Sequence, residues 1–158
     1  MAIPQKILDY LHEHCVSYRH EEHPAEGPSN DLTVRSCAAK TIIFRPNDQL
    51  LMVVLNEDRI VDMDAIKKVV GCDELPVVSE QELSDRFGSC EPTAIPPFGT
   101  LFQVPVYCDR TLAQQPEIEF HTGTATDTIR MAFSEFVQIE APTMADFSTP
   151  SGSTTRAA

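Results

Sequence analysis

Lys40 places a positive charge in the otherwise apolar segment Ala38-Ala39-Lys40-Thr41-Ile42-Ile43-Phe44. Side chains of a strand alternate between its two faces, so Lys40 is expected to share a face with Ile42 and Phe44. Burying an ammonium group costs free energy unless an anion meets it. Lys40 is therefore a candidate for the wall of a pocket that receives an anionic ligand. The alternative is a lysine at a strand end whose charged head stays in water.

A proline-bearing loop, Thr93-Ala94-Ile95-Pro96-Pro97-Phe98-Gly99, is the second candidate. Each proline fixes its φ angle and lacks an N–H group, which makes the loop rigid. The N–H groups of Thr93 to Ile95 and of Phe98 and Gly99 stay available. A rigid loop can direct such groups at a carbonyl oxygen or a developing oxyanion. The alternative is a stiff turn on the surface.

Other kinds of site find little support in the sequence. His12 and His14 are two residues apart and do not share a helix face, and His20 and His23 lack the spacing of a zinc-protease helix. The sequence has no Gly-x-Ser-x-Gly motif and no glycine-rich phosphate loop. We therefore predict no metal site and no cofactor, whereas a cysteine paired with a distant histidine stays an open alternative.

Charge and composition narrow the class of partner. The chain has 158 residues, a net charge of −12 and 42% hydrophobic residues. Such acidity argues against binding along DNA or an RNA duplex, so an RNA partner should be held by one end in a pocket. No apolar run approaches the roughly 20 residues of a membrane helix, and the first residues do not resemble a secretory signal. Five scattered cysteines favour reduced thiols, and we expect a cytoplasmic protein without membrane contact.

The pattern of elements predicts an α+β domain over residues 1–142, with a mixed, mainly antiparallel sheet. Residues 143–158 are rich in small side chains and are expected to form a disordered tail. Asp62 and Gly71 should begin and end one helix, and Ser79 with Glu82 should begin another. The remaining expected elements are helices over 4–15, from Asp31 to about Cys37 and over 133–136, and strands over 16–22, 41–45, 49–55, 104–108, 117–121 and 126–131.

These features resemble the YbaK/prolyl-tRNA-synthetase-associated editing-domain family. The resemblance runs from about residue 5 to 140. The motifs that carry it, in order, are Ala39-Lys40-Thr41, Val61-Asp62 before a helix ending at Gly71, Cys90-Glu91-x-x-Ala94-Ile95-Pro96-Pro97-Phe98-Gly99, Pro105-Val106-Tyr107-Cys108-Asp109-x-x-Leu112 and Phe120-His121.

The resemblance implies a barrel-like sheet with peripheral helices and a free-standing aminoacyl-tRNA deacylase. The family's signature lysine falls on Lys40, its carbonyl-binding loop on Thr93, Ala94, Ile95, Pro96 and Pro97, and its pocket histidine on His121. The other predicted substrate-binding residues are Phe44, Phe98, Gly99 and Gly123. The implied substrate is the 3′ end of a tRNA charged with the wrong small amino acid, presented by a synthetase or an elongation factor.

One position departs from the family. The glycine that opens the carbonyl-binding loop is Thr93 here, and threonine does not adopt a positive φ cheaply. This substitution favours the alternative of a non-catalytic ligand-binding or regulatory module that keeps the pocket.

Overall fold

The structure, a computed structural model, describes residues 5–22, 37–87, 90, 94–124 and 126–150. Its helical elements are α1 (Gln5–Glu13), η1 (Pro46–Asp48), α3 (Met63–Val70), α4 (Glu80–Arg86), α5 (Gly99–Phe102), η2 (Arg110–Gln114) and α6 (Phe133–Glu140). Its strands are β1 (Tyr18–Glu22), β2 (Ala39–Phe44), β3 (Leu51–Asn56), β4 (Arg59–Val61), β5 (Val106–Asp109), β6 (Glu117–His121), β7 (Asp127–Ala132), β8 (Thr143–Ala145) and β9 (Ser148–Pro150).

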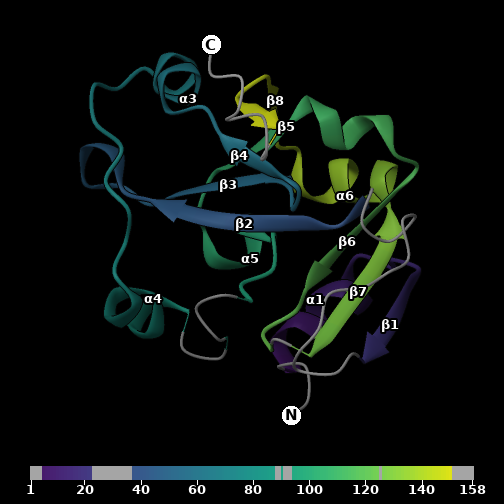
Figure 1. Ribbon diagram of the computed structural model, residues 1–158. Coiled ribbons are helices and arrows are strands. Elements are labelled where there is room, and N and C mark those ends of the chain that lie inside the picture. The colour runs from purple at the N-terminus through teal and green to yellow at the C-terminus, as the bar shows by residue number, and fades with distance from the viewer. Residues whose placement is uncertain (1–4, 23–36, 88–89, 91–93, 125, 151–158) are drawn as a thin grey trace.

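The strands form three sheets with the orders β2-β3-β5-β8, β1-β7-β6 and β4-β9 (Figure 1). The pairs β3–β5 and β5–β8 are parallel, and the other printed strand pairs are antiparallel. The predicted α+β class with a mixed, mainly antiparallel sheet is therefore confirmed. Within the described residues the sheets do not close into a barrel.

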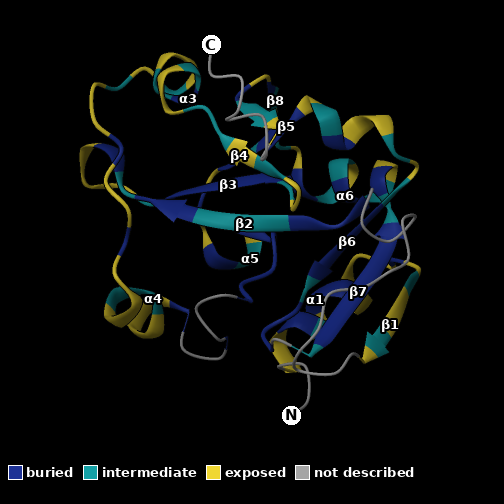
Figure 2. Cartoon of the chain, in the orientation of Figure 1, coloured by how far each residue is buried: buried dark blue, intermediate teal, exposed yellow. Residues whose placement is uncertain are grey.

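The hairpin of β2 and β3 separates two parts of the hydrophobic core. Residues Leu51 to Leu55 of β3 are all buried (Figure 2). Met52 and Val54 pack in the larger core cluster with α1, β6 and β7, whereas Leu51, Val53 and Leu55 pack in a smaller cluster with α3. A strand covered on both faces reads as a continuous apolar run, as the sequence predicts for this segment.

Two helices begin and end where local sequence signals place them. The Asp62 side chain accepts a hydrogen bond from the Ala65 N–H, and Gly71 ends α3 with φ 85°. The Ser79 side chain accepts from the Glu82 N–H at the start of α4. All three predicted caps are confirmed. The helix predicted from Asp31 falls almost entirely outside the described residues.

The prediction that the disordered tail begins at residue 143 is wrong for residues 143–150, because this segment forms β8 and β9. Phe147 is buried, and its N–H donates to Asp109 at 2.9 Å. Although the segment is rich in small side chains, its backbone pairs with β5 and β4, which are distant in sequence, and this pairing orders it as strands. The predicted boundary at 142 is therefore too early, and residues 151–158 lie outside the described part.

Cys37, Cys90 and Cys108 are buried, whereas Cys72 is partly exposed and Cys15 is exposed. The prediction that most of the thiols are buried is thus confirmed. No helix among the described residues is long and apolar enough to cross a membrane.

Candidate functional site

A cavity of about 230 Å³ opens where the start of β2 meets the end of β6. Lys40, Ile95 and His121 contribute to its wall, and these three residues come from three separate segments of the sequence. The complete lining is Ala39, Lys40, Thr41, Glu57, Ile95, Phe120 and His121.

The lining divides into an apolar base and a polar rim. Ala39, Ile95 and Phe120 are buried. Lys40 and His121 are partly exposed, and Glu57 is exposed. Such a cavity can hold a ligand with a small apolar group and charged groups near the opening.

Backbone contacts at Ala38 bring these residues together. Ala38 forms a parallel bridge with Glu119 of β6, which places the start of β2 beside the end of that strand. The carbonyl of Ala38 also accepts a hydrogen bond from the N–H of Glu57 at 2.9 Å. Ala38 thus links the start of β2, the strand β6 and the turn at Glu57. This link brings Lys40, His121 and Glu57 to one cavity.

The loop at 94–98 is buried, which excludes the alternative of a surface turn for these residues. The Ala94 carbonyl accepts from the Gly123 N–H at 2.7 Å. The Phe98 ring packs against Tyr10 and Phe120, with centroids at 5.2 and 5.1 Å. Gly99 is tightly enclosed, because an added Cβ would collide with the Val104 carbonyl and the Val106 side chain. The loop is thus held from both ends.

Ile95 carries this loop into the cavity wall. Among the described residues, no acceptor is recorded for the N–H groups of Ala94 and Ile95. Buried N–H groups normally have a partner, so these two are candidates for binding a ligand oxygen. Their availability for a ligand stays a prediction.

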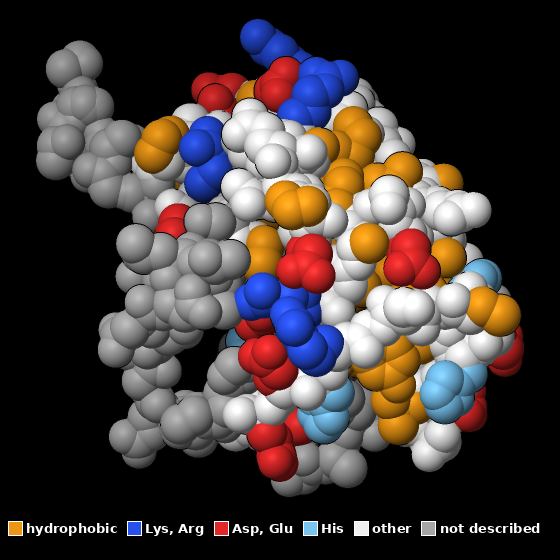
Figure 3. Space-filling view, turned by 90° about the vertical axis from the view of Figure 1, so that its right-hand side faces the viewer, with side chains coloured by type: hydrophobic (Ala, Val, Ile, Leu, Met, Phe, Trp, Pro, Cys, Tyr) orange, Lys and Arg blue, Asp and Glu red, His pale blue; other side chains and the backbone are white. Residues whose placement is uncertain are grey.

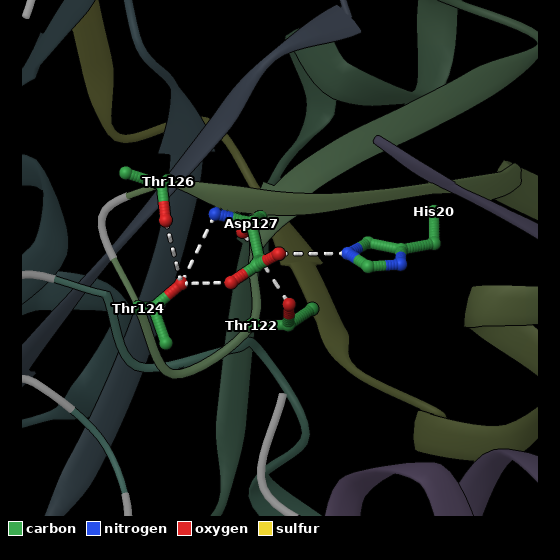
Figure 4. Close-up of polar contacts among 5 residues, drawn as sticks. All are labelled: His20, Thr122, Thr124, Thr126 and Asp127. Atoms are coloured by element: carbon green, nitrogen blue, oxygen red, sulfur yellow. Dashed lines mark hydrogen bonds and ion pairs between the residues drawn. The ribbon is translucent and has the colours of Figure 1, made fainter. Parts of the chain in front are cut away.

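A buried polar network fixes the turn that supports the loop (Figure 4). The Asp127 carboxylate lies between His20 and Thr124; His20 Nε2 approaches it at 2.8 Å and the Thr124 hydroxyl donates at 2.5 Å. Burial alone would raise the pKa of Asp127, but the hydrogen bonds from Thr124 and His20 lower it below its usual range. Gly123 lies inside this turn with φ 99°, so the network positions the N–H that holds Ala94.

His121 has a buried Nδ1 atom that forms no hydrogen bond with the part of the chain that the structure describes. A buried polar atom normally has a hydrogen-bond partner. Where such an atom lacks one at the wall of a cavity, a bound ligand can supply the partner. The sequence predicts the position of His121 through the family resemblance, and its role as a pocket residue stays a prediction.

Other predicted site residues do not line the cavity. Phe44 is buried in the smaller core cluster, because it packs with Leu51 and Ile66. Phe98 and Gly99 are buried at the end of the loop, and Gly123 binds the carbonyl at its start. Ala94, Pro96 and Pro97 flank Ile95 in the sequence. Thr93 lies outside the described residues. Conversely, sequence reasoning missed Glu57, which pairing of β2 with β3 and its contact with Ala38 bring to the cavity.

Metal-ligating side chains and cysteine thiols are two further kinds of group that could carry chemistry in this domain. Among the described residues, no three histidine, cysteine, aspartate or glutamate side chains converge to hold a metal. Burial raises the pKa of Cys108 to about 12, and burial also raises the pKa of Cys37. A thiolate nucleophile is therefore disfavoured at both cysteines at neutral pH.

The sequence matches the profile of the aminoacyl-tRNA editing domain over residues 31–139. The chain belongs to this family. This match covers the start of β2, the loop at 94–99 and His121, so the cavity lies within the editing domain. Membership supports aminoacyl-tRNA editing in general. A comparison with curated proteins finds no match for the chain.

Solved structures show the same editing-domain fold. A candidate trans-editing enzyme for prolyl-tRNA synthetase superposes with a TM-score of 0.78 and 18% identity, over 92% of this chain and 96% of that one. A candidate signal transduction protein from Marinobacter aquaeolei VT8 superposes with a TM-score of 0.75 and 16% identity over 94% of this chain. This chain spans 31% of that second protein.

Proposed function

We propose that this chain is an aminoacyl-tRNA deacylase that acts in trans on a mischarged tRNA. Its substrate would be the ester between a small amino acid, such as alanine, and the tRNA 3′ end. The observation that carries the proposal is the meeting of Lys40, Ile95 and His121 at one cavity inside the editing domain.

Each part of the wall has a role in this proposal. Lys40 forms no ion pair with any described residue, so its ammonium group is available for the phosphate of the terminal adenosine. The N–H group of Ile95 binds the ester carbonyl and stabilises the oxyanion that develops on it. His121 contacts the amino-acid side chain. Thr93 would complete the loop in place of the family's glycine.

The reaction needs few protein groups. A water oxygen attacks the carbonyl carbon, and the neighbouring ribose hydroxyl orients that water. This hydroxyl accepts a proton from the water while it passes its own proton to the ester oxygen of the ribose, and the bond from the carbonyl carbon to that oxygen breaks. The products are a free amino acid and an uncharged tRNA. An ester is activated relative to an amide, so positioning and oxyanion stabilisation can supply most of the catalysis.

The size of the cavity supports a small amino acid. About 230 Å³ must hold the amino-acid side chain, the ester and part of the ribose. The buried side chains of Ile95 and Phe120 limit the room at the base. A branched or aromatic side chain would meet these residues, and a close-packed wall yields little without a cost in free energy.

The surface charge supports recognition of the tRNA end alone. On the face drawn in Figure 3, basic side chains lie among acidic ones. Arg19 lies 3.6 Å from Glu21, and Arg130 contacts both Glu117 and Glu119. With a net charge of −12, the chain would repel the tRNA body. A synthetase or elongation factor in the cytoplasm would therefore present the 3′ end.

The experiment is a deacylation assay on a set of mischarged tRNAs, with the Lys40→Ala variant and Lys68→Ala as its control. Lys68 is an exposed residue of α3 outside the cavity, and its loss changes the net charge equally. Loss of one charge-assisted contact should lower kcat/KM by about 10- to 100-fold for Lys40→Ala. The control should retain the wild-type rate.

Other results would favour the alternatives. Tight binding of the tRNA end without release of amino acid would indicate a non-catalytic module, which Thr93 favours. Inactivation by thiol alkylation would indicate a cysteine hydrolase. Equal rates for both lysine variants would remove the basis for the proposed role of Lys40.

A further inference from the structure

Glu57 is the acidic residue of the cavity wall. Its side chain is exposed at the rim, whereas Lys40 is the basic residue of the same wall. Within the described part of the chain, neither residue forms an ion pair, and they do not pair with each other. The cavity therefore presents two separate and opposite charges to whatever enters it.

The position of Glu57 is fixed by its backbone. Lys40 pairs with Leu55 in the β2–β3 register, and Glu57 is two residues further along, opposite Ala38. Lys40 and Glu57 are thus diagonal neighbours on one face of the hairpin, and residues in this relation lie about 7–8 Å apart. The Asp58 N–H also donates to Asn56 Oδ1 at 2.8 Å, which closes the turn. The backbone of Glu57 is therefore held at a set offset from the backbone of Lys40.

The 3′ end of an aminoacyl-tRNA carries the matching pair of charges. Its terminal adenosine has a phosphate, and its amino acid has an α-ammonium group on the other side of the ester. If Lys40 binds the phosphate, as proposed above, a carboxylate offset along the same wall faces the amine. A carboxylate near the phosphate would instead repel it.

We infer that Glu57 binds the α-ammonium group of the aminoacyl ester and makes a free amine a requirement for hydrolysis. This inference rests on the proposed function and adds to it a class of rejected substrates. An N-acylated ester, such as the one in N-formylaminoacyl- or peptidyl-tRNA, has no ammonium charge for Glu57. It leaves the carboxylate without a partner and adds bulk at the rim.

The test compares alanyl-tRNA with N-acetylalanyl-tRNA prepared from the same tRNA. Wild type should have a kcat/KM about 10- to 100-fold higher for the free amine. Glu57→Gln should lose most of this preference, because its kcat/KM for the free-amine substrate falls while its kcat/KM for the acetylated substrate stays the same. Glu74→Gln is the matched control, because Glu74 is exposed, lies outside the cavity wall and carries the same charge.

A binding measurement separates this inference from the proposed function. Calorimetry with a non-hydrolysable amide analogue, 3′-alanylamino-adenosine 5′-monophosphate, and its N-acetylated form measures recognition without turnover. Wild type should prefer the free amine, and Glu57→Gln should not. An unchanged preference in Glu57→Gln, in either assay, overturns the role of Glu57. If wild type binds the free-amine analogue selectively but releases no amino acid from tRNA, the proposed deacylase activity is refuted and the role of Glu57 is still supported. If wild type binds both analogues equally, the role of Glu57 is overturned.

Discussion

The ring of His121 is partly exposed, but its Nδ1 atom is buried and has no hydrogen-bond partner among the described residues. It comes from the end of β6 and lies at the cavity beside Phe120, whose side chain packs in the core. This arrangement suits a residue that shapes a binding pocket, since its ring contributes little to the buried core. Its substitution should therefore change selectivity more than stability.

His121→Ala should widen the cavity and raise the relative kcat/KM for a larger amino acid, such as valine over alanine. Differences of one or two methyl groups are worth about 10- to 200-fold in such pockets. The measurement is deacylation of valyl- and alanyl-tRNA, accompanied by urea unfolding to check the fold. His12→Ala, at an exposed position of α1, is the control. An unchanged selectivity ratio would contradict the pocket assignment of His121.

Elements remote from the cavity hold its loop in place. The turn between β6 and β7 contains Gly123, which binds Ala94, and it is followed by Asp127, the first residue of β7, which contacts His20 of β1. The carboxylate of Asp127 is buried, so the loss of its charge leaves donors poorly paired. The edge strand β1 thus contributes to the position of the loop at 94–98 without reaching the cavity wall.

Asp127→Asn should lower the free energy of unfolding by about 1.5–3 kcal/mol and reduce kcat, because the loop loses its support. Asp146→Asn is a matched control with the same change of charge, since Asp146 and its partner Arg110 are both well exposed. An exposed ion pair contributes at most about 1 kcal/mol. Urea unfolding and deacylation measure both effects. Equal losses of stability in the two variants would contradict this account of the network.

The β9 segment is attached through the preceding residue, Phe147. Its side chain is buried in the smaller core cluster, and Asp109 accepts from its N–H and from the Ser148 hydroxyl. Phe147→Ala should destabilise the chain by about 3–5 kcal/mol. Val77→Ala, at a residue that is 71% exposed, should change stability by no more than about 0.5 kcal/mol. A similar urea midpoint for the two variants would show that this segment is not docked in solution.

At the scale of the whole molecule, buried carboxylates make stability depend on pH in two opposite ways. Burial by itself would raise the pKa of Asp109 and of Asp127, but hydrogen bonds to the two carboxylates have the larger combined effect and lower it. Their contribution is complete above the unfolded pKa, about 4, and is lost as pH falls through the lower folded value. Glu140 behaves in the opposite way, because burial raises its pKa more than its hydrogen bonds from Thr100 and Tyr10 lower it.

For Glu140, the folded state binds a proton more tightly than the unfolded state. Its contribution is therefore present below the unfolded pKa, about 4.3, and is lost as pH rises through the higher folded value. Glu140→Gln should gain stability relative to wild type as pH rises from about 4 to 7. Glu74→Gln is the exposed control. Parallel pH profiles for Glu140→Gln and wild type, measured by thermal or urea unfolding, would contradict this prediction.

Local sequence signals predicted much of the secondary structure. The caps at Asp62, Gly71 and Ser79 depend on contacts within four residues, so their chemistry can be read from the chain itself. The α5 helix was not predicted, because a four-residue helix has little periodicity of its own. Residues 143–150 were misassigned because their strand partners, β5 and β4, lie more than thirty residues earlier.

The sequence by itself determined the family, the α+β class and the identities of Lys40, Ile95 and His121 as candidates, because ordered motifs and local patterns carry that information. The tertiary structure decided that these three residues line one cavity, that Glu57 joins them and that Phe44 does not. The physical reason is that the meeting depends on Ala38, whose contacts with Glu119 and Glu57 link segments far apart in the chain.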